Sequence, residues 1–232
     1  MRLKVKQALH SEQAHAGVEV AGWVRTKRDN KGFSFLEIND GSCLRNLQAV
    51  VDHGVPGASD LPDVLTGASV RLRGDLVPSP AKGQAWELKA THLELLGRAD
   101  ATFPLQKKGH TPEFLRSIPH LRARTNRIGS ALRVRSRMAM EVHRFFQDRG
   151  FAYVHTPVIT ASDCEGAGEL FRVTTLDPVA PPKDAAGKVD WAADFFGRQA
   201  YLTVSGQLEG ETLACALGDV YTFGPTFRAE NS

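Results

Sequence analysis

The chain has 232 residues, of which 42% are hydrophobic and 24% are charged, and its formal net charge is +3. This size accommodates two small domains of ordinary globular composition, and so mild a charge does not by itself indicate nucleic acid as a partner. No run approaches the roughly 20 apolar residues of a membrane span, the first residues lack the apolar core of a secretion signal, and three widely spaced cysteines (Cys43, Cys164 and Cys215) favour a reducing cytoplasm over a disulfide framework or a zinc site.

The first 100 residues have the pattern of a small β-barrel. Five strands are predicted near residues 18–26, 33–39, 46–52, 69–78 and 86–95, separated by glycine and Asp-Gly turns. A short helix is predicted near residues 60–65, between the third and fourth strands. This combination is typical of the five-stranded Greek-key barrel of the OB type, which binds single-stranded nucleic acid on one face.

The first hairpin of this barrel carries the residues best suited to such binding. Basic side chains can offset backbone phosphates, and an exposed phenylalanine can stack on an unpaired base. Because Phe33 and Phe35 are two apart on a strand, they share one face. The residues alone leave open whether that face is outward or toward the core, and whether the charges are only a solvated turn. The basic residues of the hairpin are Arg25, Lys27, Arg28 and Lys31.

Residues 101–127 form a cationic linker that Pro104, Pro112 and Pro119 punctuate, which disfavours one long helix. It is either a hinge that also touches an RNA backbone or a solvated connection. A helix is predicted over residues 128–150, with Thr125 or Asn126 as its N-cap and Gly150 as its stop. An extended run to Pro157 follows.

The rest of the chain alternates loops with short elements. Residues 161–176 hold a glycine-rich loop flanked by Glu165 and Glu169, and residues 177–200 are predicted to be a surface excursion without chemistry. A strand over 201–204, a helix over 207–217 and a strand over 220–223 follow.

Arg228 and Glu230 come two apart near the end of the chain. On a strand they would share a face, where the arginine could hold a phosphate and the glutamate could accept hydrogen bonds from an amine. On spacing alone, an ordinary surface ion pair remains the alternative.

Several motifs have residue sequences that are more specific than these secondary-structure patterns. The segments SDCEGAGELF (162–171), SGQLEGE (205–211) and VYTFGPTFRAENS (220–232) closely resemble the class II aminoacyl-tRNA synthetases, specifically the asparaginyl branch. The resemblance extends along essentially the whole chain. It implies an α+β protein with an OB-fold anticodon-binding barrel in residues 1–100, a hinge in 101–127 and the first part of an antiparallel-sheet catalytic domain in 128–232.

The function implied by this resemblance is the ATP-dependent activation of L-asparagine to its adenylate, followed by transfer to the 3′ end of tRNA(Asn). An aspartyl enzyme and a non-catalytic RNA-binding fragment remain the alternatives. In the barrel, the resemblance implies that Phe35 stacks on the middle anticodon base and that Arg28 and Gln48 contact the first base. The motif that ends at Pro157 implies a homodimer interface.

The resemblance also implies an amino-acid and nucleotide site. Glu165 would bind the α-ammonium group of asparagine, and Ser205 and Gln207 would bind its backbone. Arg228 would stabilise the α-phosphate of ATP and the attacking carboxylate, so that no side-chain nucleophile is needed. Glu230 would orient the adenosine or the tRNA terminus.

Selection of asparagine over aspartate has a candidate cause in this motif. Aspartyl enzymes typically carry a lysine where this chain has Gly210, so no cation is supplied to a substrate carboxylate there. Glu211 or Glu230 could instead accept hydrogen bonds from the amide. Because the chain stops within this motif, we expect a truncated synthetase, with the acids that bind Mg²⁺ beyond residue 232.

Overall fold

The computed structural model describes residues 1–81, 83–162 and 170–229. By its internal contacts the chain divides into two compact units, Met1–Arg135 and Ser136–Ser232. The boundary between them falls inside the long helix α3 (Asn126–Gln147), as does the domain boundary expected from the sequence between residues 127 and 128.

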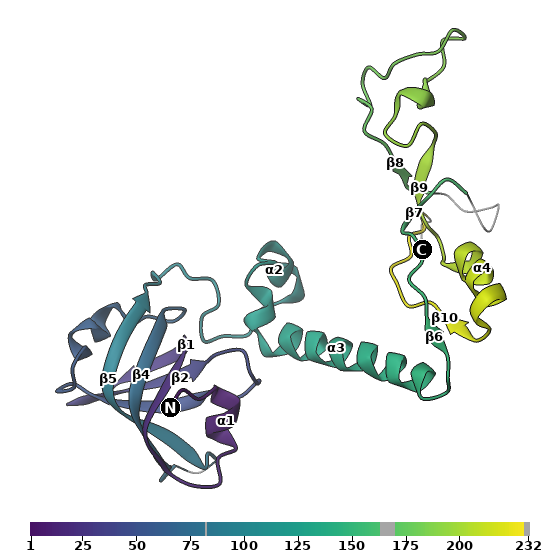
Figure 1. Cartoon of the computed structure of the whole chain (residues 1–232). Coiled ribbons are helices and arrows are strands. Elements are labelled where there is room, and N and C mark those ends of the chain that lie inside the picture. Colours follow the sequence, from purple (N-terminus) through teal and green to yellow (C-terminus); the bar gives the residue numbers. More distant parts are fainter. Residues whose placement is uncertain (82, 163–169, 230–232) are drawn as a thin grey trace. The chain divides into compact units, whose positions relative to one another are not determined.

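Five strands of the first unit close into a barrel in the order β1-β2-β3-β5-β4, with β4 returning to β1 (Figure 1). All pairs are antiparallel except β3 with β5, the arrangement that a Greek-key path produces. A 3₁₀ helix, η1 (Ala58–Asp63), lies between the third and fourth strands, so the five strands and the intervening helix are as predicted. The strands are β1 (His15–Asp29), β2 (Phe33–Asn39), β3 (Leu47–Asp52), β4 (Ser69–Pro78) and β5 (Trp86–Gly97).

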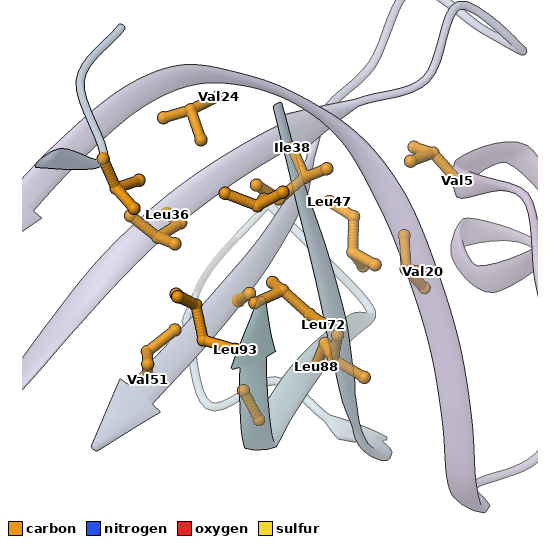
Figure 2. Close-up of a cluster of buried hydrophobic side chains, with 14 of the residues drawn as sticks. Val5, Val20, Val24, Leu36, Ile38, Leu47, Val51, Leu72, Leu88 and Leu93 are labelled. Carbon is orange, nitrogen blue, oxygen red and sulfur yellow. The ribbon is translucent and has the colours of Figure 1, made fainter. Parts of the chain in front are cut away.

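The barrel interior is filled by aliphatic side chains from every strand (Figure 2). In β2, the side chains alternate strictly between partly buried and buried positions, as expected for a strand with one face on a core. A short helix, α1 (Val5–Leu9), adds Val5 and Ala8 to the same core. Packing on this continuous core holds the strands in place. The backbone of the residues on the outer face of the barrel is therefore held in place too.

The linker is tied to the barrel rather than free. It contains α2 (Pro112–Ser117) and the 3₁₀ helix η2 (Arg122–Arg124). The Thr111 hydroxyl accepts a hydrogen bond from the Phe114 amide, so α2 begins with a side-chain cap and with proline at its first position. The Arg124 guanidinium lies 4.2 Å from the centre of the Trp23 ring of the barrel. Burial is the main cause that lowers the pKa of Arg124, and the nearby charge of Arg25 adds to it.

Helix α3 begins and ends within a few residues of the predicted range. The Thr125 hydroxyl accepts a hydrogen bond from the Ile128 amide, at 3.4 Å, as an N-cap would, and Gly150 has the positive φ of 83° expected beyond a helix end. Gly129 is the only buried residue of α3. Many of its large apolar side chains are exposed in this structure, whereas Ile128, Val142 and Phe146 are partly buried.

The second unit contains two small sheets. The parallel pair is β6 (Ala152–Tyr153) with β10 (Val220–Tyr221). The antiparallel sheet has the order β7-β9-β8, with β7 (Ile159–Thr160), β9 (Ala200–Leu202) and β8 (Arg172–Val173). Helix α4 (Gln207–Leu217) has the predicted bounds.

The excursion between β8 and β9 is held by Asp194. Its carboxylate accepts hydrogen bonds from the Thr174 hydroxyl, from the amide and hydroxyl of Thr175, and from the amide of Phe195. The short 3₁₀ helix η3 (Trp191–Ala193) precedes it, and Arg172 lies over the Trp191 ring at 4.7 Å. The predicted surface excursion is thus an ordered segment of the second unit.

One prediction for this unit is wrong within the described residues. Residues 222–229 are not in a strand, so Arg228 does not lie on a sheet face. The Phe227 amide donates to the Thr203 carbonyl at 2.9 Å, but no further ladder of hydrogen bonds extends this contact into a described strand.

Over the described parts of the chain, no helix combines the length and apolar character needed to cross a membrane.

Candidate nucleic-acid interface and amino-acid site

The outer face of the first hairpin brings an arginine and a phenylalanine together. Arg28 of β1 is paired with Phe35 of β2, so their side chains project on the same side of the sheet. The Arg28 guanidinium carbon lies 4.6 Å from the centre of the Phe35 ring, which is within cation–π range. Phe33 meets Phe35 edge to face, with 5.2 Å between the ring centres.

Both phenylalanines face outward. Their neighbours Ser34 and Leu36 are fully buried, and a strand directs successive side chains to opposite faces. The alternative that Phe33 and Phe35 are core residues is therefore wrong. An aromatic ring carrying a guanidinium on a barrel surface can stack on an unpaired base while the cation approaches its phosphate.

The basic residues of the hairpin do not act as one cluster. The Lys27 side chain is only 15% exposed, lies 3.4 Å from Asp29, and its ammonium group donates to the Leu61 carbonyl at 2.6 Å. Lys27 therefore points to the other side of the hairpin from Arg28, because adjacent strand residues alternate. The prediction that Lys27 joins a phosphate-binding group with Arg28 is not supported by this geometry.

Gln48 of β3 lies on the same outer face as Arg28 and Phe35. It is paired with Glu37, which is two residues beyond Phe35 on β2. The Gln48 amide nitrogen donates to a Glu87 carboxylate oxygen at 3.2 Å, and the Ser79 hydroxyl donates to that same oxygen at 2.9 Å. Glu87 therefore orients the Gln48 amide, and the Gln48 carbonyl oxygen accepts no hydrogen bond that is found among the described residues. Sequence reasoning missed Glu87, although its place on a predicted strand put it on a barrel surface.

The second unit has a hollow of about 240 Å³ that includes two of the predicted residues, Pro157 and Ser205. Gly206 permits its close walls, because a Cβ atom at this position would come within 2.6 Å of the Thr156 hydroxyl oxygen and 3.2 Å of the Thr222 methyl carbon. Thr203, Thr222 and Thr226 also line the hollow, and sequence reasoning did not single them out. The hollow is thus lined with hydroxyl groups.

Two further predicted residues of this site, Gln207 and Arg228, are described by the structure but do not line the hollow. Gln207 is exposed in the first turn of α4, its amide nitrogen donates to Glu211 at 2.9 Å, and its backbone amide contacts the Ser205 hydroxyl at 3.3 Å. Arg228 is exposed and does not line this hollow. The predicted ligands Glu165 and Glu230 lie outside the described residues.

The described part of the chain offers no group of three or more His, Cys, Asp or Glu side chains arranged to hold a metal ion. The polar side chains that line the hollow are hydroxyl groups, from tyrosine, serine and threonine residues, and the imidazole of His155. Such groups can bind a ligand through hydrogen bonds.

Comparison with protein-family models gives two matches. Residues 111–232 match the model described as tRNA synthetases class II (D, K and N), which covers more than half of the chain. Residues 18–96 match the OB-fold nucleic acid binding domain. The second match confirms that the barrel is the predicted OB fold.

Individual proteins are similar along the whole chain. An asparagine–tRNA ligase of Nitratidesulfovibrio vulgaris (strain DP4) is 60% identical over 232 residues, which are 100% of this chain and 50% of that protein. An asparagine–tRNA ligase of Geobacter sulfurreducens is 59% identical over 231 residues, which are 100% of this chain and 50% of that protein. The chain spans about half the length of these curated relatives.

A solved structure shows the same fold. The asparaginyl-tRNA synthetase from Pyrococcus horikoshii, complexed with asparaginyl-adenylate, matches with a TM-score of 0.80 at 24% identity. The match covers 100% of this chain and 49% of that chain. It supports a class II arrangement for the short sheets that follow the barrel.

Proposed function

This chain belongs to the class II tRNA synthetases of the D, K and N group, and we propose that it is part of an asparagine–tRNA ligase that charges tRNA(Asn) for protein synthesis. The observation that carries this proposal is the match to asparagine–tRNA ligases along all 232 residues. Because the chain spans about half the length of those relatives, the complete reaction is proposed for a protein that includes this chain.

The barrel would read the anticodon. Phe35 would stack on the middle base, because an exposed aromatic ring can stack on a base that is not paired. Arg28 and Gln48 would contact the first base, and Gln48 would offer its carbonyl oxygen to a donor on that base. This last role follows from the hydrogen bond that holds the Gln48 amide nitrogen on Glu87.

The second unit would contribute to asparagine activation. Class II synthetases that make an aminoacyl-adenylate use ATP, and the asparagine carboxylate would attack its α-phosphorus and release pyrophosphate. Ser205 and Gln207 would bind the backbone of asparagine, and Arg228 would stabilise charge on the α-phosphate and the carboxylate. Glu165 would hold the α-ammonium group, and Glu230 would orient the adenosine or the tRNA terminus. The roles of both glutamates are proposed from the sequence match alone. The same holds for Mg²⁺, whose ligands we expect beyond residue 232.

Discrimination against aspartate would come from the absence of a cation at Gly210. A Cβ atom there would lie 3.6 Å from the Thr222 methyl carbon, so a side chain at this position would point toward a residue that lines the hollow. Without a lysine at Gly210, a substrate carboxylate would be left without its partner. An uncompensated buried charge is a strong ground for rejection.

We also propose a homodimer, as the motif through Pro157 implies, acting in the cytoplasm. Helix α3 supports the dimer because it presents large apolar side chains that are about half exposed or more. These are Leu132 at 49%, Val134 at 61%, Met138 at 57%, Met140 at 58% and Phe145 at 51%. A second copy of the chain would cover them.

The test is a chimera that joins these 232 residues to the part of the 60% identical relative that they do not cover. We expect ATP–pyrophosphate exchange driven by asparagine and not by aspartate. Exchange driven by aspartate would make the protein an aspartyl enzyme. A chimera that binds tRNA(Asn) but exchanges with neither amino acid would leave only the RNA-binding function.

A further inference from the structure

A hydrogen-bonded network lies on the inner side of the first hairpin, directly behind the residues assigned to the anticodon. The Ser34 hydroxyl donates to Asp29 Oδ1 at 2.6 Å, and its oxygen lies 3.1 Å from His53 Nε2. Ser34 is fully buried, whereas its neighbours Phe33 and Phe35 face outward. A buried hydroxyl on the core side of a barrel requires such partners.

The direction of each hydrogen bond follows from proton count. A serine hydroxyl has one proton, and Ser34 gives it to the Asp29 carboxylate, which can only accept. The contact with His53 therefore has Nε2–H as the donor and the serine oxygen as the acceptor. The network runs from His53 through Ser34 to Asp29, and Lys27 lies 3.4 Å from the other Asp29 oxygen. The Ser34 hydrogen bond is the main cause that lowers the pKa of Asp29, and the charge of Lys27 acts in the same direction.

The network joins the three strands that meet at the tip of the hairpin. Asp29 of β1 and Ser34 of β2 are paired directly across the hairpin, next to the Arg28–Phe35 pair. His53 follows the last residue of β3, and its backbone amide donates to the Gly32 carbonyl in the turn at 2.9 Å. Because neighbouring residues on a strand point to opposite faces, a fixed inner pair also fixes the outer pair.

We propose that His53, Ser34 and Asp29 are positioning residues that hold Arg28 and Phe35 ready to receive an unpaired base. This inference rests on the proposed function of the barrel as the anticodon reader. Preorganisation raises affinity because the ordering cost is met before the RNA arrives. In this role the network acts through the orientation of the Arg28–Phe35 pair rather than by contact with the RNA.

The test uses the full chain with three variants. Ser34→Ala removes the centre of the network, His53→Leu removes only the donor at an exposed position, and His53→Gln keeps a side-chain N–H donor there. Thr91→Val is the matched control, because the Thr91 hydroxyl donates to a backbone carbonyl elsewhere on the barrel, at 3.2 Å. Thermal unfolding is measured for each variant.

The first readout needs no RNA. In the parent chain, NMR is expected to show contacts between the Arg28 side chain and the Phe35 ring. These contacts are expected to weaken in Ser34→Ala and His53→Leu, and to persist in His53→Gln and Thr91→Val. If the contacts are the same in every variant that folds, the positioning role is overturned.

The second readout is the affinity for an RNA hairpin with the asparagine anticodon in its loop. We expect Ser34→Ala to weaken binding about tenfold and to reduce the preference for uridine over adenosine at the middle base, with recovery in His53→Gln relative to His53→Leu. Weakening without any loss of base preference would mean a merely structural role. If the parent chain shows no preference for this hairpin, the anticodon proposal fails, and the NMR contacts alone decide the positioning role.

Discussion

His143 of α3 is hydrogen-bonded to Tyr221 of β10, with 2.7 Å between the His143 Nδ1 atom and the tyrosine oxygen. Phe146, one turn further along α3, stacks on the Tyr221 ring with 4.6 Å between the ring centres. The helix is thereby fastened to the strand that leads toward Arg228. In a class II synthetase this contact would connect the helix proposed for dimerisation with the site proposed for activation.

Tyr221→Phe tests this contact, because it keeps the stacked ring and removes only the hydroxyl. We expect a loss of about 1 kcal/mol in the free energy of unfolding, since His143 would be left with one hydrogen-bond partner fewer. Urea denaturation measures it. Tyr153→Phe is the control: the Tyr153 hydroxyl donates to the Phe223 carbonyl at 3.1 Å in an exposed position, so its loss is expected to be smaller. Equal losses for the two variants would contradict a special role for Tyr221.

Phe35→Ala tests the stacking surface of the barrel. Loss of one stacked base costs about 1–3 kcal/mol, which corresponds to a roughly 5- to 150-fold weaker affinity for tRNA(Asn). Fluorescence anisotropy with labelled tRNA measures it, and ATP-dependent chemistry in a complete enzyme is expected to be unaltered. Phe195→Ala, which removes a ring that is 76% exposed in the second unit, is expected to change little. Unchanged affinity in Phe35→Ala would remove the assignment.

Asp194→Asn tests the carboxylate that organises the excursion before β9. Hydrogen bonds, chiefly from Thr174, hold the pKa of Asp194 well below its usual range. A lowered pKa in the folded state means that the charged form stabilises the fold above the ordinary value near 3.9, and that this stability is lost as pH falls through the folded pKa. We therefore expect Asp194→Asn to be less stable than the parent at pH 7 and to approach it in strong acid.

Unfolding of the Asp194 variant by urea across a pH series measures this difference. Asp177→Asn is the control, because Asp177 is exposed and accepts a side-chain hydrogen bond only from the Val179 amide among the described residues. A difference between Asp194→Asn and the parent that does not vary with pH would show that the charge of Asp194 is not what stabilises the segment.

Met138→Glu tests the proposed dimer. Met138 is 57% exposed on α3, and a buried carboxylate at an apolar interface is unfavourable. We expect the parent chain to sediment as a dimer and the variant to shift toward monomer. Gln147→Glu adds the same charge at the last, exposed residue of the helix and is expected to leave association intact. A parent chain that sediments as a monomer at all concentrations would contradict self-association through α3.

Gly206→Ala tests the wall of the hollow in the second unit. The added methyl group would come within 2.6 Å of the Thr156 hydroxyl oxygen, so we expect a loss of about 1–3 kcal/mol in stability. Gly224→Ala is the matched control, because Gly224 lines the same hollow and a Cβ atom there meets nothing within 4 Å. Thermal unfolding of the two variants is expected to separate them, and equal stability would contradict the close packing around Gly206.

The elements that follow one local pattern were predictable from the sequence. The alternation in residues 33–39 and the bounds of α4 needed only period and turn chemistry, and both agree with the structure. Arg228 was different: residues 222–229 do not form a strand, and strand formation depends on pairing that local sequence cannot supply. The side to which Phe33 and Phe35 point also required the fold, because a period of two gives a shared face but not its direction.

The sequence by itself indicated which segments are barrel strands, linker and long helix. Its motifs also indicated the class II family. Only the tertiary structure decided which side chains meet. It separated Lys27 from Arg28, oriented Gln48 on Glu87 and placed His53 behind Ser34. The physical reason is that hydrogen bonds depend on distance and direction between groups that are far apart in the chain, and closure of the barrel brings those groups together.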